Sequence, residues 1–436
     1  MLRRVFLLLL IASPAWAGPP DAVTDSDYTP VEAAEAKLGQ LLFYDPILSG
    51  NRNIACATCH HPRFGTSDGL SLGIGEGGIG LGTERVLDPK NMPEQRIPRN
   101  ATALWNLGAK EFKVLFVDGR IEADPSKPNG IRTPMEDDMT YGFSGVLAAQ
   151  TMFPVLAQDE MAGHYGENDV SKLARQGRIT GEGGAWAAIA DRVAALPEYQ
   201  KRFEAVYPEI AAGRTIAFTD IANALAAFMT FEFRSDDSPF DAQLRGEVPL
   251  QGAALRGMDL FYGAAGCSDC HAGKFQTDHA FHAMAVPQIG PGKKARFEDT
   301  FRDEGRIRVT GNAEDAFRFR TPSLRNVALT APYGHDGAYR DLRKFVAAHV
   351  QPNAQTAYDR SQAILPDLPG ATDWAVLDDP AETAAVKAAY EGPDPGLSDK
   401  DLDALVAFLD TLTGATARSG RLGVPETVPS GLKVDR

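Results

Sequence analysis

The sequence has few cysteines and no hydrophobic run that could cross a membrane. Only four of its 436 residues are cysteines, and all four belong to two Cys-x-x-Cys-His motifs at residues 56–60 and 267–271. No cysteine is left over to pair in an oxidising compartment. The apolar run at residues 5–11 is too short to span a bilayer, and no later stretch is longer and equally apolar. We therefore expect no membrane span in the mature chain.

Excess positive charge is also missing. The formal net charge is -14 at pH 7, which argues against a nucleic-acid partner held through its phosphates. An acidic surface suits a basic partner patch, and it equally serves solubility.

Strand signals are sparse, so the chain is predicted to be mostly α.

The N-terminus has the three parts of a secretory signal peptide. Met1-Leu2-Arg3-Arg4 is basic, an apolar run follows, and Ala15-Trp16-Ala17 has the small-x-small pattern of a cleavage site. We predict a signal peptide at residues 1–17 and a periplasmic destination. The alternative is a buried N-terminal helix.

Each Cys-x-x-Cys-His motif has the residues that attach a c-type haem. The thiols of Cys56 and Cys59, and those of Cys267 and Cys270, can add to the haem vinyl groups. The adjacent His60 and His271 can each ligate the iron. Two haems are therefore predicted. The alternatives are a redox disulfide, half a zinc site, or one zinc held by all four thiols; the last would leave the two histidines unexplained.

The pattern around the two motifs is repeated. Helical periodicity at residues 31–43 precedes the first motif, and periodicity at 253–261 precedes the second. Further helices are expected at 185–196, 221–233, 341–349 and 402–412. We predict two tandem cytochrome-c-like haem domains with long loops and little strand, at residues 18–245 and 246–418, followed by a loose tail at 419–436.

The glycine-rich loop at residues 65–82 contains Gly73-x-Gly75-x-x-Gly78, which formally matches a dinucleotide-binding fingerprint. No strand pattern precedes it and no helix pattern follows it, so we reject that interpretation.

Several longer motifs resemble those of the bacterial di-haem cytochrome c peroxidase and MauG family. The resemblance extends over nearly the whole mature chain, and the sequence is closest in pattern to the MauG-like branch. The motifs that carry it are Pro98-Arg99-Asn100-Ala101, Asp118-Gly119-Arg120, Ser238-Pro239-Phe240-Asp241, residues 257–261, and the run from Arg320 to Gly337 that includes Thr330-Ala331-Pro332-Tyr333.

The resemblance implies that the N-terminal haem reacts with hydrogen peroxide. The family's distal pocket has a Gln, a Pro four residues later and a Glu six residues after that, which correspond to Gln150, Pro154 and Glu160. A carboxylate there can move a proton between the peroxide oxygens, and an amide can orient them. Without its two partners, Glu160 would be read as a surface carboxylate.

Many peroxidases of the family place a histidine on that distal face from the loop after the first motif. No histidine occurs here between His61 and His164. The resemblance therefore implies that the N-terminal haem is five-coordinate and open, as in MauG.

At the C-terminal haem the family uses Met or Tyr as the sixth ligand. Counting without gaps from Thr330 and Pro332 places His349 at that position, and Tyr358 is the alternative if a small gap intervenes. A bis-histidine iron would store an oxidising equivalent and would not bind peroxide. His349 can also be an ordinary helix-face histidine.

The resemblance further implies one calcium ion between the haems, with oxygen ligands from Asn100, Thr330 and Pro332. Asn100 can equally cap a turn. One departure stands out: the family's inter-haem tryptophan is replaced by Val117, and Trp105 lies twelve residues earlier. An insertion at residues 121–145 follows this motif, where it would build a partner surface or cover the pocket.

These features predict a peroxide-dependent di-haem oxidoreductase that oxidises a protein or another electron-rich donor at a distance, as MauG-like enzymes do. One rival is a cytochrome c peroxidase that removes peroxide with a small cytochrome as donor. A rival of another class is a non-catalytic di-haem electron carrier, which would have two six-coordinate haems.

Overall fold

The computed structural model describes residues 18–136, 138, 141–295, 298–351 and 357–436. The predicted signal peptide at residues 1–17 lies outside the described residues. The fold is 38% helix and 6% strand, which confirms the prediction of a mostly α protein. No helix in the described part of the chain is both long and apolar enough to cross a membrane.

The helices are α1 (Ala33–Tyr44), α2 (Cys56–Cys59), α3 (Val146–Gln150), α4 (Asp169–Arg175), α5 (Ala185–Ala194), α6 (Pro197–Val206), α7 (Pro208–Ala211), α8 (Phe218–Glu232), α9 (Pro239–Leu244), α10 (Gly252–Phe261), α11 (Ile307–Thr310), α12 (Leu342–Val350), α13 (Ala375–Asp378), α14 (Pro380–Ala388), α15 (Asp399–Asp410) and α16 (Thr416–Ser419). The strands are β1 (Gly78–Ile79), β2 (Val86–Leu87), β3 (Val114–Leu115), β4 (Ile121–Ala123), β5 (Ile131–Arg132), β6 (Phe281–His282) and β7 (Phe319–Arg320). They form the antiparallel pairs β1-β2 and β6-β7 and the three-stranded sheet β3-β4-β5.

Each half of the chain contains the same pair of crossing helices. In the N-terminal half α1 packs on α8, and a Cβ on Gly39 would lie 1.8 Å from the carbonyl oxygen of Ala224. In the C-terminal half α10 packs on α15, and a Cβ on Gly257 would lie 1.9 Å from the carbonyl oxygen of Ala404. Only glycine allows the two backbones to approach so closely. The helix that precedes each haem motif is therefore anchored in the same way.

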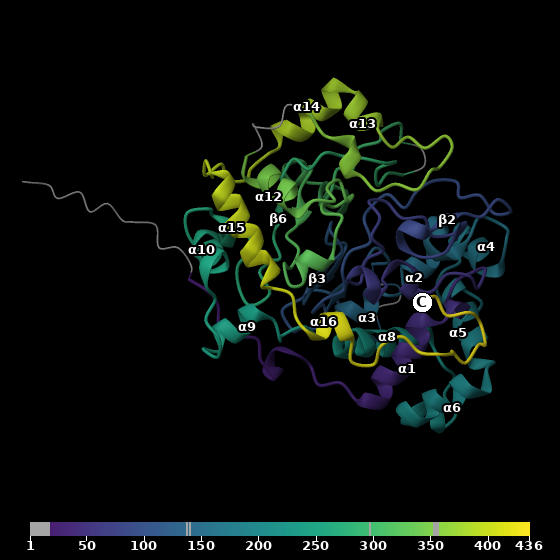
Figure 1. The fold of residues 1–436 in the computed structure, drawn as a ribbon. Coiled ribbons are helices and arrows are strands. Elements are labelled where there is room, and N and C mark those ends of the chain that lie inside the picture. The colour runs from purple at the N-terminus through teal and green to yellow at the C-terminus, as the bar shows by residue number, and fades with distance from the viewer. Residues whose placement is uncertain (1–17, 137, 139–140, 296–297, 352–356) are drawn as a thin grey trace, which may run out of the picture.

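Two hydrophobic cores correspond to these two helix pairs. One core is built mainly from residues 23–233 and also includes Phe275, Ala417, Val428 and Val434, and the other contains residues from Phe240 to Leu412 around α15. In Figure 1, α1, α2, α5 and α8 lie on one side of the molecule, and α10, α12 and α15 lie on the other. Phe240 precedes the predicted domain boundary but belongs to the second core, and Phe275 follows it but belongs to the first, so that boundary stays a prediction.

The C-terminal residues 419–436 return to the N-terminal half (Figure 1). Val428 and Val434 are buried in its core. The Gln40 amide donates to the Gly423 carbonyl at 2.6 Å, and the Thr58 hydroxyl donates to Asp435 at 3.0 Å. The prediction of a loose tail is therefore wrong. The segment is too short and polar to show a helical or strand period, and only the packed structure shows what it covers.

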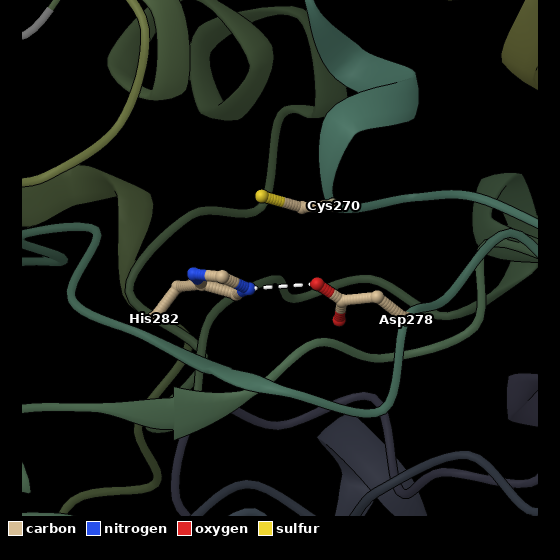
Figure 2. A group of neighbouring side chains, drawn as sticks. All are labelled: Cys270, Asp278 and His282. Atoms are coloured by element: carbon tan, nitrogen blue, oxygen red, sulfur yellow. Dashed lines mark hydrogen bonds and ion pairs between the residues drawn. The ribbon is translucent and has the colours of Figure 1, made fainter. Parts of the chain in front are cut away.

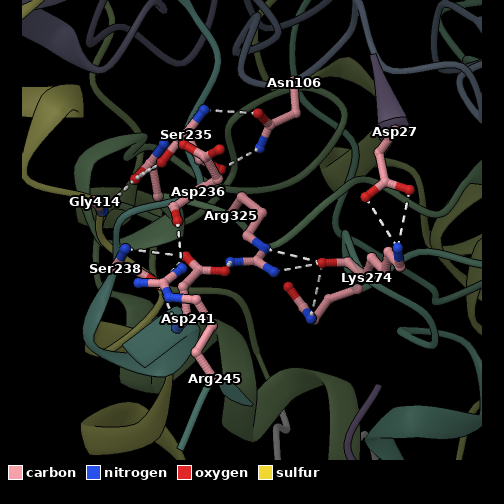
Figure 3. A network of polar contacts seen from close by, with 12 residues as sticks. Asp27, Asn106, Ser235, Asp236, Ser238, Asp241, Arg245, Lys274, Arg325 and Gly414 are labelled. Carbon is pink, nitrogen blue, oxygen red and sulfur yellow. Dashed lines mark hydrogen bonds and ion pairs between the residues drawn. The ribbon is translucent and has the colours of Figure 1, made fainter. Parts of the chain in front are cut away.

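A buried polar network joins the halves (Figure 3). Arg325 and Asp241 form a fully buried ion pair at 2.7 Å, and Arg325 also donates to the Lys274 carbonyl at 2.5 Å. Lys274 in turn pairs with Asp27, from the start of the chain, at 2.9 Å. Removing one partner of such a buried pair would leave an uncompensated charge. The network therefore holds residues from distant parts of the chain in one arrangement.

Candidate haem and peroxide site

The first Cys-x-x-Cys-His motif forms a short helix with its histidine fixed just after it. α2 holds both thiols, and a hydrogen bond of 3.0 Å joins His60 Nδ1 to the Thr66 carbonyl. Burial lowers the pKa of His60, so its imidazole is neutral at pH 7. A ring whose Nδ1 is bound to a carbonyl is the arrangement expected when Nε2 ligates a metal.

The second motif repeats this arrangement. A hydrogen bond of 3.1 Å joins His271 Nδ1 to the Gln276 carbonyl, and burial lowers the pKa of His271. Cys267 and Cys270 are both free thiols, as are Cys56 and Cys59. Each motif thus offers two thiols and one neutral, oriented imidazole, which is the donor set of a c-type haem.

A cavity of about 290 Å³ lies beside the second motif. Its wall includes Cys267, Cys270 and His271, and it is otherwise built largely from aromatic and aliphatic side chains such as Phe261, Phe345 and Leu405. A mostly apolar cavity against a Cys-x-x-Cys-His motif fits a haem. The residues present therefore suit the cofactor that the motif predicts.

His349 lies on the wall of the same cavity, at the end of α12. Its Nδ1 is 3.2 Å from the Phe345 carbonyl, so its ring is bound to a backbone carbonyl like those of His60 and His271. Burial and the neighbouring His271 lower the pKa of His349 to about 4. The alternative ligand Tyr358 donates its hydroxyl to the Ala338 carbonyl and packs edge-on against Tyr339, away from the cavity lining.

The three residues predicted for the distal pocket come from consecutive short elements. Gln150 ends α3, Pro154 begins a single 3₁₀ turn, and Glu160 lies in a π-helical turn, Gln158–Ala162. Trp186 anchors the bend between the first two by donating to the Met152 carbonyl at 2.8 Å. π-helical turns are rare and often occur at functional sites.

Glu160 lies within electrostatic reach of the first haem motif. Burial raises the pKa of the Cys59 thiol to about 12, and the charges of Asp68 and Glu160 contribute to that rise. The pKa of Glu160 is itself raised by burial, although Lys293 and Arg120 oppose the shift. Lys293 belongs to no sequence motif, and Arg120 belongs to the Asp118-Gly119-Arg120 motif. No local signal could have identified Lys293, since it comes from the other half of the chain.

The glycine-rich loop at residues 65–82, which contains no histidine, packs directly on the turn Gln158–Ala162 that carries Glu160. Gly75 approaches so closely that a Cβ there would lie 2.6 Å from the Glu160 carbonyl oxygen. Arg85 ties the loop together by donating to the carbonyls of Ile74, Gly75 and Gly80. The glycines therefore serve close backbone packing next to the pocket, and no helix follows Gly78, where β1 begins.

The three predicted calcium ligands lie on the wall of the cavity beside the second motif. The Asn100 amide nitrogen donates to the Leu70 carbonyl at 2.7 Å, which leaves its oxygen as the acceptor. Thr330 donates its hydroxyl to the Val327 carbonyl at 3.0 Å. Asn100, Thr330 and Pro332 together offer oxygen atoms of the kind that a hard cation prefers.

Val117 and Trp105 both line this cavity. Trp105 is only 4% exposed, and none of the described residues places a polar atom within hydrogen-bond distance of its Nε1. The preceding residue, Leu104, donates its amide to the Thr66 hydroxyl at 2.8 Å, and the Thr66 carbonyl binds His60. Trp105 therefore lies at the cavity beside the second motif, and hydrogen bonds through Leu104 and Thr66 connect its backbone to His60 of the first motif.

In the described part of the chain, one other group of side chains could hold a metal (Figure 2). Ligand atoms of Cys270, Asp278 and His282 lie within 4.8 Å of one another, and His282 is hydrogen-bonded to Asp278 at 2.8 Å. Covalent haem attachment consumes the Cys270 thiol, so this trio cannot compete in the haem-loaded protein. Among the described residues, which include all four cysteines, no group unites four thiols as the zinc alternative requires.

The fold and these sites define a c-type di-haem oxidoreductase. A sequence profile of the family described as di-haem cytochrome c peroxidase matches residues 33–249. The chain belongs to this di-haem cytochrome c peroxidase and MauG family, as its motifs predicted, and it is an enzyme of peroxidase or MauG type.

Relatives of both types are similar to the chain. Methylamine utilization protein MauG of Paracoccus denitrificans is 29% identical over 90% of this chain and 92% of its own. Cytochrome c551 peroxidase of Pseudomonas aeruginosa is 27% identical over 77% of each. The crystal structure of a MauG-like protein associated with microbial copper homeostasis has a TM-score of 0.60 and 26% identity, over 94% of this chain and 96% of that chain.

Proposed function

We propose that the protein is a periplasmic, MauG-like enzyme that uses hydrogen peroxide at an open N-terminal haem to oxidise a protein or another electron-rich donor at a distance. The observation that carries this proposal is the arrangement of residues around the first motif. A half-buried carboxylate, Glu160, lies within electrostatic reach of Cys59, and the loop packed against it contains no histidine.

The chain's own residues would handle the protons of the peroxide. The Glu160 carboxylate accepts a proton from one peroxide oxygen and returns it to the departing oxygen, which leaves as water. The Gln150 amide orients the peroxide, and Pro154 shapes the turn between them. Bound at His60, the haem supplies the iron that takes up the oxidising equivalents of the peroxide.

The C-terminal site would act as the reservoir for an oxidising equivalent. His271 and His349 lie on the same cavity and have neutral rings, so both can serve as ligands of one iron. We assign His349 as the sixth ligand and Asn100, Thr330 and Pro332 as ligands of one Ca²⁺. Trp105 takes over the inter-haem position for which Val117 is chemically unsuited.

Low-temperature electron paramagnetic resonance of the ferric protein tests the open haem. We expect one high-spin and one low-spin iron per chain. Two low-spin irons would remove the peroxide site and leave the electron-carrier alternative. In the same preparation, Glu160→Gln should slow the reaction with peroxide by about 10²- to 10⁴-fold, whereas Asp159→Asn, which keeps the Glu160 carboxylate and removes only a neighbouring charge, should have a much smaller effect.

A cytochrome c peroxidase with a small cytochrome donor is the second candidate. It is favoured by the cytochrome c551 peroxidase of Pseudomonas aeruginosa, whose identity to the chain is close to that of the MauG relative. Steady-state turnover with reduced cytochrome c and peroxide distinguishes the two candidates. Rapid turnover would support the peroxidase, and negligible turnover would support the MauG-like proposal.

A further inference from the structure

A loop of the C-terminal half, residues 288–292, is held in place by several hydrogen bonds and lies next to the proposed peroxide pocket of the N-terminal half. Residues 288–292 are all buried. Gln288 exchanges two hydrogen bonds with the Asp303 backbone at 2.8 and 3.0 Å, the Ile289 amide donates to Asp336 at 2.8 Å, and the Gly290 amide donates to the Asp373 carbonyl at 2.9 Å. These bonds fix the position of the residue that follows the loop, Lys293.

This loop touches the histidine-free loop of the first half. A Cβ on Gly290 would lie 2.1 Å from the Leu72 side chain. Leu72 is three residues before Gly75, which packs on the backbone of Glu160. Residues 72–75 therefore pack both on the loop that leads to Lys293 and on the backbone of Glu160.

Lys293 is half-buried and coupled to Glu160 by charge. Its pKa is lowered by burial and by Arg120, and it is raised by Glu160. The pKa of Glu160 is raised by burial and lowered by Lys293 more than by Arg120. Asp159, on the same turn as Glu160, acts in the opposite direction. Lys293 is thus the strongest favourable charge that Glu160 experiences.

Ion pairs next to Glu160 and Lys293 fix the other charged side chains of this region. Arg99 binds Asp118 and Asp303, each at 2.6 Å, and Arg120 binds Asp118 at 2.9 Å. Arg99, Arg120 and Lys293 are thus the cations near Glu160, and Asp159 adds a negative charge beside it. Burial and Asp159 favour the protonated form of Glu160, and Lys293 and Arg120 favour the ionised form.

We propose that Lys293 is a positioning residue of the peroxide pocket, supplied by the C-terminal half as the counter-charge that keeps the Glu160 carboxylate ready to accept a proton. The inference rests on the proposed function. It adds that the pocket is complete only when both halves are docked, because the loop that carries Lys293 is held by residues of the second half.

Cyanide binding tests this without turnover. Hydrogen cyanide must give up a proton to bind ferric iron as an anion, so its binding rate should fall as pH drops through the pKa of the pocket base. We would measure this rate against pH in the di-haem protein for the wild type, Lys293→Met, Lys293→Arg and Lys294→Met. Lys294 is a matched control, because its Nζ lies 4.2 Å from the Phe301 ring centroid.

Removing the Lys293 charge should move the midpoint of the cyanide profile to higher pH by about one unit. The peroxide reaction should show the same displacement. Lys293→Arg should restore the wild-type midpoint in large part, and Lys294→Met should not move it. Coincident midpoints for Lys293→Met and Lys294→Met would overturn the inference. So would a change in the reduction potential of the first haem without a displaced midpoint, since Lys293 would then be paired with the haem.

A double variant guards against simple loss of structure. In a Glu160→Gln background, Lys293→Met should have no further effect on either profile. An undiminished additional effect would mean that Lys293 acts through the fold, and would overturn the inference. Failure of the wild type to bind cyanide or to react with peroxide would instead refute the proposed function, so the two failures can be told apart.

Discussion

Three histidines of this protein share one local geometry. His60, His271 and His349 each have Nδ1 at hydrogen-bond distance from a backbone carbonyl, at 3.0 to 3.2 Å. Such a bond fixes both the tautomer and the ring orientation and leaves Nε2 for a metal. The first two follow directly from the Cys-x-x-Cys-His spacing. The third lies in an ordinary helical stretch, and only its place on the cavity wall distinguishes it.

Replacement of His349 tests its proposed role. His349→Ala should convert the low-spin iron of the second haem to a high-spin form, because it removes the proposed sixth ligand. Tyr358→Phe should leave the spectrum unchanged, since the Tyr358 hydroxyl is bound to the Ala338 carbonyl. Absorption and electron paramagnetic resonance spectra of the ferric variants measure this. The reverse pattern would assign the ligand to Tyr358.

Trp105 is the residue that the proposed electron route requires. Trp105→Phe should slow the transfer of oxidising equivalents between the haems by about tenfold, equivalent to ~1.4 kcal/mol in the barrier, because phenylalanine is much harder to oxidise than tryptophan. Rapid-mixing spectroscopy after peroxide addition measures the transfer. Trp374→Phe is the control, since Trp374 packs on Arg360 outside the cavity lining. Equal rates in the two variants would exclude Trp105 from the route.

At the scale of elements, the glycine-rich loop packs closely against the backbone of the π-helical turn that carries Glu160. Gly75→Ala would place a Cβ within 2.4 to 2.8 Å of the backbone atoms of Asp159 and Glu160. The carboxylate should shift, and a displacement of about 1 Å should lower kcat/KM for peroxide by about 10²-fold.

Gly145→Ala is the matched control for this substitution. A Cβ on Gly145 meets no atom within 4 Å, and its backbone is extended, with φ at 165°. Its kcat/KM should stay close to that of the wild type. If Gly75→Ala also kept full activity, the loop would not position Glu160.

Sequence periodicity predicted the main helices of both halves, because an apolar face repeats locally. The expected helix at residues 31–43 is α1, and the one at 402–412 largely coincides with α15. Periodicity does not predict the repeated packing of these helices. Its signal is short: Ala-Leu-x-Ala-Phe occurs at residues 224–228 and again at 404–408, where Ala224 faces Gly39 of α1 and Ala404 faces Gly257 of α10.

At the scale of the whole molecule, buried ion pairs connect the halves and should set its acid stability. Burial alone would raise the pKa of Asp118, but Arg99 and Arg120 outweigh it and lower the pKa to about 2, against 3.8 for the unfolded chain. The carboxylate therefore contributes stability above about pH 4. This contribution, ~2.5 kcal/mol, is lost as pH falls from about 4 to 2.

Asp118→Asn should lower the free energy of unfolding by about 3 kcal/mol at pH 7, because Arg99 and Arg120 lose a buried partner. The difference from the wild type should shrink near pH 2. Urea unfolding at the two pH values measures it. Asp399→Asn, which removes an exposed ion pair with Arg343, should cost less than ~1 kcal/mol. A constant difference across pH would show that Asp118 is not ionised in the folded protein.

The sequence by itself determined the cofactor chemistry and the helical class, because haem attachment and helix periodicity depend on residues a few positions apart. The tertiary structure alone decided how distant parts meet. In the folded protein, residues 419–436 pack on the N-terminal core and His349 lies at the cavity of the second motif. Lys293 lies within electrostatic reach of Glu160. Such proximities arise from packing and charge pairing between segments far apart in the chain, which no local spacing encodes.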